Sequence, residues 1–290
     1  MLITTRLYFA LIHANIYSMD TEDKKTNTQS KQNLKQNLKP AESFLIAISM
    51  YSIIPVPAKE WRKENMAAAI CFLPVVGILV GAVLFLWQLL CVGLGIETVI
   101  FASVAAIIPV ILTGGIHMDG FMDTADALGS HKSREEKLAI MKDSHAGAFA
   151  ILWCAAYLLL SFGVYWALYE KTYFWLVGII FVLSRCLCAI SALTLPAARD
   201  GGILVAFTEF AKNRAAIVIM LVISVLCVAG VAYFDLYVGI VYAVIAIVIF
   251  FVYRGLALKQ FGGVTGDTSG FFIQICELCL LYGVLIGCSL

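Results

Sequence analysis

Seven apolar stretches, each long enough to cross a lipid bilayer, decide what this chain can fold into. A membrane-spanning helix needs about 20 mostly apolar residues. Such runs occupy residues 66–92, 98–116, 147–169, 173–195, 215–233, 236–253 and 270–288. The 290 residues are 62% hydrophobic and only 13% charged, which is too little charge to cover a water-soluble domain. The sequence therefore predicts an all-α fold: a polytopic integral membrane bundle of about seven transmembrane helices.

Two segments precede the first of these stretches. Residues 1–40 end in a run rich in Lys, Asn, Gln and Thr. We interpret them as a polar N-terminal extension, either disordered or produced by an over-extended start of translation. Residues 44–57 are apolar but too short to span, and they end in Pro55 and Pro57. We expect a short re-entrant or interfacial segment there, with residues 41–290 forming one membrane-embedded domain.

Lysine and arginine fall almost entirely on one side of the predicted membrane. If the segment before the first stretch is cytoplasmic, the loops on that side hold Lys59, Arg62, Lys63, Lys132, Arg134, Lys137, Lys142, Arg199, Lys212, Arg214, Arg254 and Lys259. The opposite loops hold only Lys171. Cytoplasmic loops normally carry this excess, so we expect a multi-pass protein of the cytoplasmic (inner) membrane whose polar motifs face the cytoplasm.

The opposite loops are very short and carry no chemical motif, which favours a one-sided membrane enzyme over a transporter. The net charge of +1 and the lack of a basic stripe interleaved with aromatic residues give no reason to expect a nucleic-acid partner. Most of the nine cysteines lie in apolar runs. We interpret them as small apolar residues within helices, not as metal or redox sites.

The densest polar motif is residues 114–126, in which Asp119, Asp123 and Asp126 are spaced i, i+4 and i+7. On a helix these three carboxylates share one face, where they repel one another unless a cation neutralises them. Mg²⁺ takes one or two carboxylates together with substrate phosphates. The motif therefore favours a Mg²⁺ site for a phosphorylated ligand over a solvated acidic face. Nearby His117 is a candidate for contacting substrate.

The next motif, residues 133–147, predicts a short helix opened by a capping box at Ser133 and Glu136 and running to Lys142. Lys142 could contact a phosphate, and Asp143 could be a metal ligand or a base. A plain polar helix boundary explains this pair equally well.

Two arginines near the predicted fourth span are also candidates. Arg185 lies within an apolar stretch, where a charge is costly and normally faces a partner or a cavity. It would pair with an intramembrane acid or with a substrate phosphate. Arg199 precedes two glycines at the end of that stretch and is either a phosphate clamp or a snorkelling arginine at a helix stop.

The last motif, residues 262–270, contains four glycines and leads into the final span. We expect a loop with exposed N–H groups suited to anions, so Gly262, Gly263 and Thr265 are candidate substrate contacts. Asp267 is a fourth candidate metal ligand. Glu277 is a second acid within an apolar stretch.

Several separated motifs together resemble the cobalamin synthase family, the adenosylcobinamide-GDP ribazoletransferases. They are Gly-Gly-Ile-His-Met-Asp-Gly-Phe-Met-Asp-Thr-Ala-Asp-Ala at 114–127, Met-Lys-Asp-Ser-His-Ala-Gly at 141–147 and Gly-Gly-Val-Thr-Gly-Asp-Thr-Ser-Gly at 262–270. Residues 72–77 and 184–199 also look like blocks of this family. The resemblance runs in order from about Phe44 to the C-terminus. It departs at Ala127, where the family usually has Gly, and it does not cover residues 1–40.

The resemblance implies that residues 41–290 are a catalytic domain joining α-ribazole, or its 5′-phosphate, to adenosylcobinamide-GDP with release of GMP. This is the last assembly step of adenosylcobalamin, and it requires Mg²⁺. Partners would be the two substrates, the lipid bilayer and either a second copy or other nucleotide-loop assembly enzymes. The roles we assign are catalytic for Asp119, Asp123, Asp126, Lys142 and Asp143; metal-binding for Asp119, Asp123, Asp126 and Asp267; and substrate-binding for His117, Arg185, Arg199, Gly262, Gly263, Thr265, Asp267 and Glu277.

Two other functions remain open from the residues. A CDP-alcohol phosphotransferase also places several aspartates on membrane helices, but its Asp-Gly-x-x-Ala-Arg spacing is absent from this sequence. A cation transporter could use the intramembrane acids, although the bare opposite loops argue against it.

Overall fold

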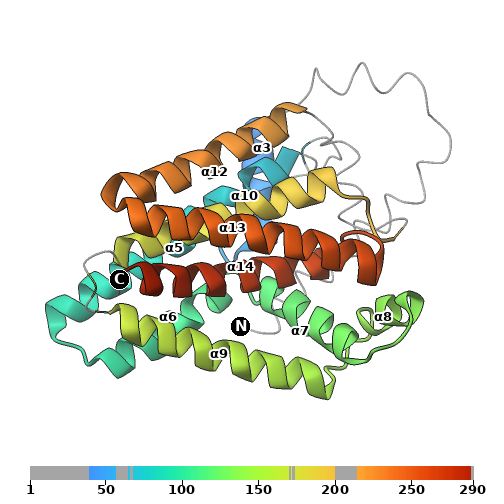
Figure 1. The fold of residues 1–290 in the computed structure, drawn as a ribbon, viewed down its shortest axis with the longest axis horizontal. Coiled ribbons are helices and arrows are strands. Elements are labelled where there is room, and N and C mark those ends of the chain that lie inside the picture. The colour runs from blue at the N-terminus through green and yellow to red at the C-terminus, as the bar shows by residue number, and fades with distance from the viewer. Residues whose placement is uncertain are drawn as a thin grey trace.

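The computed structural model describes residues 39–56, 65, 68–169, 171, 174–199 and 214–288. Our interpretation of residues 1–40 falls outside these ranges except at Lys39 and Pro40. In the described part, six segments are long and apolar enough to span a membrane, and a bent helix pair can supply a seventh span. The prediction of a polytopic helical membrane protein is confirmed (Figure 1).

The helices follow the predicted apolar stretches closely. The described segments are α3 (Pro40–Tyr51), η3 (Ile70–Phe72), α5 (Leu73–Leu94), α6 (Thr98–Leu112), α7 (Ile116–Gly129), α8 (Arg134–Ile140), α9 (Ala148–Leu168), η4 (Phe174–Leu176), α10 (Val177–Thr194), α12 (Arg214–Phe234), α13 (Leu236–Leu256), the π-helix η5 (Ala257–Phe261) and α14 (Gly266–Gly287). The last helix begins four residues before the predicted span, so half of the glycine-rich motif is helical.

The second predicted span, residues 98–116, is wrong as a single straight helix. Helix α6 has only 15 residues, and α7 departs from it at an angle of 92°. The break lies at Gly114 and Gly115, which have φ values of 64° and 79°. Side chains rarely adopt this left-handed region, so these glycines make the bend.

The short apolar segment before the first span is confirmed as too short to cross a bilayer. Helix α3 has 12 residues, and the chain that follows it packs against the α6–α7 break. The N–H of Ile53 donates to the carbonyl of Leu112 at 2.9 Å, and Tyr51 stacks on His117 with 6.2 Å between ring centroids. This segment therefore braces the bend from which α7 projects.

Helices α10 and α14 form the buried centre of the bundle, whereas α9, α12 and α13 expose large apolar side chains on their outer faces. Glycines allow the closest crossing of α5 and α10. A Cβ at Gly81 would lie 2.6 Å from the Cα of Gly178, and one at Gly77 would overlap the backbone of Phe181. Small residues at such contacts are the usual means of packing helices in lipid, where dispersion contacts hold helices together.

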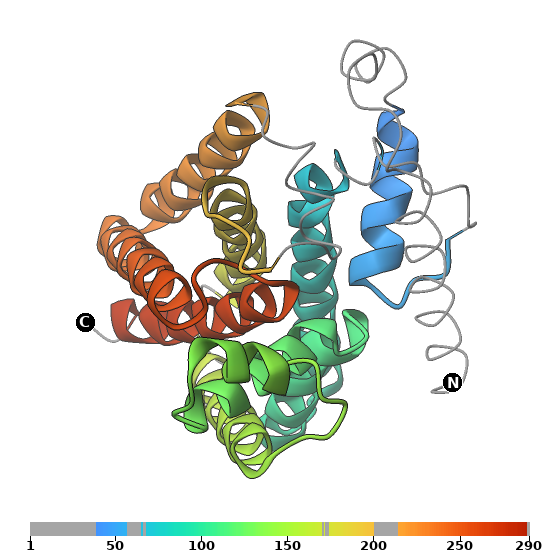
Figure 2. The ribbon, with the colours of Figure 1, turned by 90° about the vertical axis from the view of Figure 1, so that its right-hand side faces the viewer.

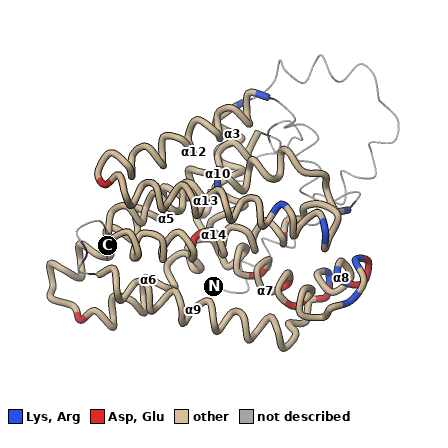
Figure 3. The backbone as a smooth tube through the Cα atoms, in the orientation of Figure 1, with Lys and Arg blue, Asp and Glu red and all other residues tan. Residues whose placement is uncertain are grey.

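Most of the described charges gather at one end of the bundle (Figure 3). We call this the charged end. It consists of α7, α8, residues 196–199, the C-terminal end of α13 with η5, and the N-terminal end of α14, all of which face the viewer in Figure 2. The opposite end carries Glu97, Lys171 and Asp235 in its turns. The predicted separation of charges therefore holds in three dimensions.

Candidate active site

The three aspartates of α7 project from one helical face near the charged end. Asp119 lies in the first turn of α7, and Asp123 and Asp126 follow one and two turns later. The carboxylate of Asp123 lies in the repulsive field of three others, which are Asp119, Asp267 and Asp126 in decreasing order of strength. The helix therefore presents a concentrated negative charge, as the i, i+4, i+7 spacing predicted.

Helix α14 brings the fourth aspartate to this face. The backbone of Asp267 lies directly against Gly120, where an added Cβ would be 2.7 Å from the Asp267 carbonyl oxygen. Gly270 provides the matching gap on α14, because a Cβ there would be 2.9 Å from the carbonyl oxygen of His117. The two helices can cross this closely only because neither carries a side chain at the contact.

The start of α14 is fixed by a capping box. The Thr265 hydroxyl accepts the N–H of Thr268 at 3.0 Å, and the Thr268 hydroxyl accepts the N–H of Thr265 at 2.8 Å. Both side chains are buried. This reciprocal cap sets where the helix begins and so places Asp267 in its first turn, facing α7. Thr265 acts here as a positioning residue.

The N–H groups of residues 262–265 are bonded within the protein, so the expectation of exposed N–H groups is wrong for this part of the glycine-rich motif. Gly262 and Gly263 donate to the carbonyls of Leu258 and Ala257 at 3.1 Å each. Val264 donates to the carbonyl of Pro196 at 2.9 Å. The segment instead pairs with residues 196–198, forming a parallel bridge between Ala197 and Val264.

The loop that leads to α9 touches the acidic face at one residue. A Cβ at Gly147 would overlap the carboxylate of Asp126, so this glycine lies flat against it. Lys142 and Asp143 are exposed. Asp143 pairs with His145 through Oδ1 and Nδ1 at 2.7 Å; hydrogen bonds from the His145 side chain and backbone lower the pKa of Asp143. The structure thus pairs the exposed Asp143 with His145.

Helix α8 begins with the predicted capping box, in which Ser133 and Glu136 bind each other's backbone N–H groups. The helix ends at Ile140, two residues earlier than expected.

Arg185 and Glu277 pair with each other in the centre of the bundle. Their side chains are 1% and 2% exposed, and Nη1 of Arg185 lies 2.5 Å from Oε1 of Glu277. Ser184 donates a second hydrogen bond to the same carboxylate oxygen at 3.1 Å. Of the two roles open from sequence, pairing with an intramembrane acid is the one observed for Arg185. His117 is also buried in this region, within the field of Arg185.

Arg199 links the acidic face to α8. Its Nη2 donates to the carbonyl of Leu138 at 2.6 Å, and its guanidinium attracts the carboxylate of Asp267. Its buried Nε has no hydrogen-bond partner among the described residues. Arg199 therefore lies within the electrostatic field of one of the predicted metal-binding carboxylates.

The donor set on α7 and α14 fits Mg²⁺. Within the described ranges, no three His, Cys, Asp or Glu side chains form a ready-made metal site. Mg²⁺ does not require such a cage, because it keeps several waters and binds through one or two carboxylates plus substrate phosphates. The mutual repulsion of the carboxylates around Asp123 is the feature that a divalent ion would relieve.

Sequence reasoning missed the part played by Gly120 and Gly270. The signal was present, since Gly266 and Gly270 are four residues apart, as are Gly120 and the fully buried Thr124. Small residues at this spacing are typical of close helix contacts in membranes.

Comparisons with known proteins show the family of this chain. The family model described as "Cobalamin-5-phosphate synthase" matches residues 43–285. The chain is 38% identical over 250 residues to the "Adenosylcobinamide-GDP ribazoletransferase" of Lachnoclostridium phytofermentans, covering 86% of this chain and 95% of the relative. It is 30% identical over 247 residues to the Clostridium botulinum (strain Alaska E43) protein of the same name, covering 84% and 97%.

Another relative with that name, from Pseudomonas entomophila, is 33% identical over 248 residues, covering 84% of this chain and 98% of the relative. No solved structure is significantly similar to the chain. The matched region contains the four aspartates, the α7–α14 crossing and the buried ion pair. The chain therefore belongs to the cobalamin-5-phosphate synthase family.

Proposed function

We propose that this chain is a Mg²⁺-dependent adenosylcobinamide-GDP ribazoletransferase that joins α-ribazole, or its 5′-phosphate, to adenosylcobinamide-GDP and releases GMP. The observation that carries the proposal is the convergence of Asp119, Asp123 and Asp126 on α7 with Asp267 on α14, in a chain of this family. Four clustered carboxylates at a membrane surface match a substrate that contains a diphosphate.

The reaction is a displacement at phosphorus. A ribose hydroxyl of the acceptor attacks the phosphorus attached to the corrinoid, a new P–O bond forms, and the P–O–P bridge breaks with its electron pair leaving on GMP. A product with a 5-phosphate, as in the family description, has its 5′ oxygen already occupied. The nucleophile is then another ribose hydroxyl.

The residues of this chain would contribute position and charge, which dominate catalysis of phosphoryl transfer. Asp119, Asp123, Asp126 and Asp267 would hold Mg²⁺, which when bound masks negative charge on the diphosphate. One carboxylate of the group accepts the hydroxyl proton. Arg199, which is held near Asp267, would balance part of the remaining negative charge of the bound substrates.

The orientation follows from the same charges. We place the charged end on the cytoplasmic side of the inner membrane, because the lysines and arginines there obey the positive-inside rule. Both substrates would then approach from the cytoplasm. A homo-oligomer or a complex with other nucleotide-loop assembly enzymes would also have to form in this orientation.

The test is to reconstitute the chain in liposomes and supply adenosylcobinamide-GDP and α-ribazole with Mg²⁺ or with EDTA. We expect GMP and the joined corrinoid only with Mg²⁺. CMP release from a CDP-activated lipid would instead indicate the lipid phosphotransferase. Cation flux without any nucleotide would indicate the transporter.

A further inference from the structure

Three cationic side chains of α8 and the chain after α10 form no ion pair with an acid among the described residues. They are Arg134 and Lys137 on α8 and Arg199 after α10. Among the described residues none of them forms an ion pair with a carboxylate; the ion pairs found there are Lys39–Glu42, His145–Asp143 and Arg185–Glu277. The three cations are bonded to neutral oxygens instead.

Lys137 is the most buried of the three cations. The residue is only 8% exposed, and its ammonium donates to the amide oxygen of Gln260 at 2.5 Å. Buried charges in proteins are normally paired with an opposite charge, because desolvating an unpaired ion is expensive. A buried lysine whose bond among the described residues is to a neutral amide oxygen is therefore suited to an anion that arrives with the substrate.

The two arginines link α8 to the chain after α10 by a pair of hydrogen bonds that run in opposite directions. Arg134 Nη2 donates to the carbonyl of Ala198 at 3.4 Å, and Arg199 Nη2 donates to the carbonyl of Leu138. The guanidinium of Arg134 also occupies the space where a Cβ at Gly262 would lie. Each arginine uses a single donor in these carbonyl bonds, and a guanidinium has five.

Two residues that accept hydrogen bonds from these arginines, Ala198 and Leu138, belong to a small apolar cluster near the end of α7. Ala127, Met141, Ala198 and Phe261 pack together there with Leu138 and Leu256. Ala127 directly follows Asp126 in sequence, and Arg199 lies within the field of Asp267. The cationic group is therefore connected to the acidic face through Arg199, while Arg134 and Lys137 are bonded to Ala198 and Gln260.

We propose that Arg134, Lys137 and Arg199 bind the phosphate monoester of a phosphorylated acceptor. The proposal rests on the proposed function. The diphosphate of the donor is matched by the carboxylates with their metal, whereas a metal-free group of three cations matches a dianionic monoester. The phosphate monoester is also what distinguishes the two printed names. The family model is named for a 5-phosphate product, whereas the relatives are named for a ribazole transfer. This site would make kcat/KM higher for the phosphorylated acceptor than for α-ribazole.

The experiment compares two acceptors, α-ribazole and α-ribazole 5′-phosphate, in the reconstituted wild type and in Lys137→Met and Arg134→Gln. Methionine keeps the apolar stem of Lys137, and Arg134 is exposed, so both variants should fold. A charge-assisted hydrogen bond contributes enough for its loss to cost about 10- to 100-fold. We expect kcat/KM to fall by that factor for α-ribazole 5′-phosphate and to stay nearly unchanged for α-ribazole.

The matched control is Lys259→Gln, an exposed cation on η5 beside Gln260, which should leave both acceptors unaffected. An equal loss for both acceptors would overturn the proposal, since it would mean a structural role or contact with the donor. An unchanged preference would overturn it as well.

A binding measurement separates this proposal from the proposed function. Calorimetry with α-ribazole 5′-phosphate alone, in EDTA and without the corrinoid, should give binding to the wild type and weaker binding to Lys137→Met. If no chain turns over but this difference persists, the enzymatic assignment fails and the anion site stands. If the wild type binds no phosphorylated acceptor, the anion site is refuted.

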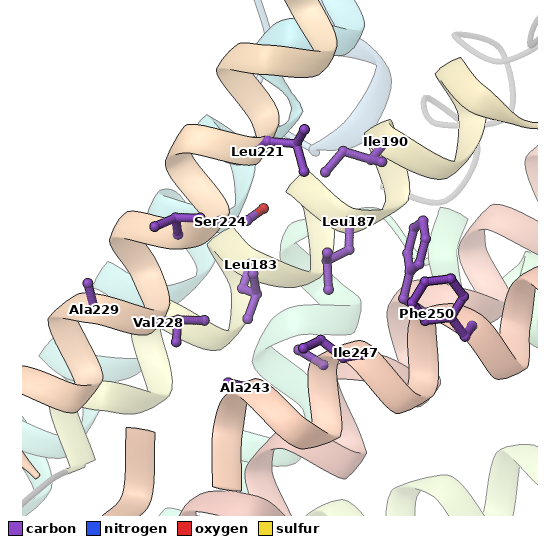
Figure 4. A pocket seen from close by; sticks show the side chains of 13 residues that line it. Leu183, Leu187, Ile190, Leu221, Ser224, Val228, Ala229, Ala243, Ile247 and Phe250 are labelled. Carbon is purple, nitrogen blue, oxygen red and sulfur yellow. The ribbon is translucent and has the colours of Figure 1, made fainter. Parts of the chain in front are cut away.

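The apolar cavity of about 510 Å³ between α10, α12 and α13 carries no comparable inference. Its walls include Leu183, Leu187, Ser224, Ile247 and Phe250 (Figure 4), and it opens among lipid-facing residues.

Discussion

Replacing Gly120 by alanine should impair catalysis more than it impairs folding. The new Cβ would lie 2.7 Å from the carbonyl oxygen of Asp267 and 2.8 Å from its Cα. Normal contacts of this kind are about 3.5–4.0 Å, so α14 must move away from α7 by roughly 1 Å. Both obstructing atoms are backbone, and no rotamer change can relieve them.

The displacement moves Asp267 relative to Asp119 and Asp123, and a misplacement of about 1 Å in a catalytic group can cost about 10²-fold in rate. Overpacking destabilises by about 1–3 kcal/mol, but alanine regains up to ~1 kcal/mol of helix propensity over glycine. We therefore expect GMP release to fall by about two orders of magnitude with only a small loss in thermal stability.

The assay is the initial rate of GMP release at saturating substrates in proteoliposomes, with thermal unfolding followed in detergent. Gly255→Ala is the matched control, because a Cβ there meets nothing within 4 Å, and it should keep full activity. If Gly120→Ala works within about two-fold of the wild type, the close α7–α14 crossing does not position the site and the reasoning fails.

Asp123→Asn should lower turnover by about 10²- to 10³-fold while the protein still inserts, and near-normal GMP release would remove Asp123 from the metal site. Glu277→Gln should cost about 3–5 kcal/mol in mixed-micelle denaturation, because it leaves Arg185 as a buried unpaired charge; the double variant Glu277→Leu with Arg185→Met should recover much of this, and equal losses would contradict the pairing. His145→Ala should raise the pKa of Asp143 toward its ordinary range by removing the side-chain hydrogen bond that lowers it, and carboxyl ¹³C NMR titration would show no change if the bond is absent in solution.

The sequence determined that the protein is a helical membrane protein and that most of its charges lie at one end of the bundle. Hydropathy over about 20 residues suffices for this, because lipid demands internally bonded helices of a fixed length. The spacing of Asp119, Asp123 and Asp126 determined a shared helical face, since the period of an α-helix is local. The capping box at Ser133 and the failure of residues 44–57 to reach across a bilayer could be predicted for the same reason.

Only the tertiary structure decided which of these groups meet. Asp267 reaches the α7 face because Gly120 and Gly270 allow two distant helices to touch, and Arg185 finds Glu277 across 92 positions of sequence. The N–H groups of residues 262–265 turned out to be bonded within the protein, and Lys137 proved to be a buried cation bonded to the Gln260 amide, with no ion pair among the described residues. These outcomes depend on packing between segments far apart in the chain, and local periodicity carries no information about such contacts.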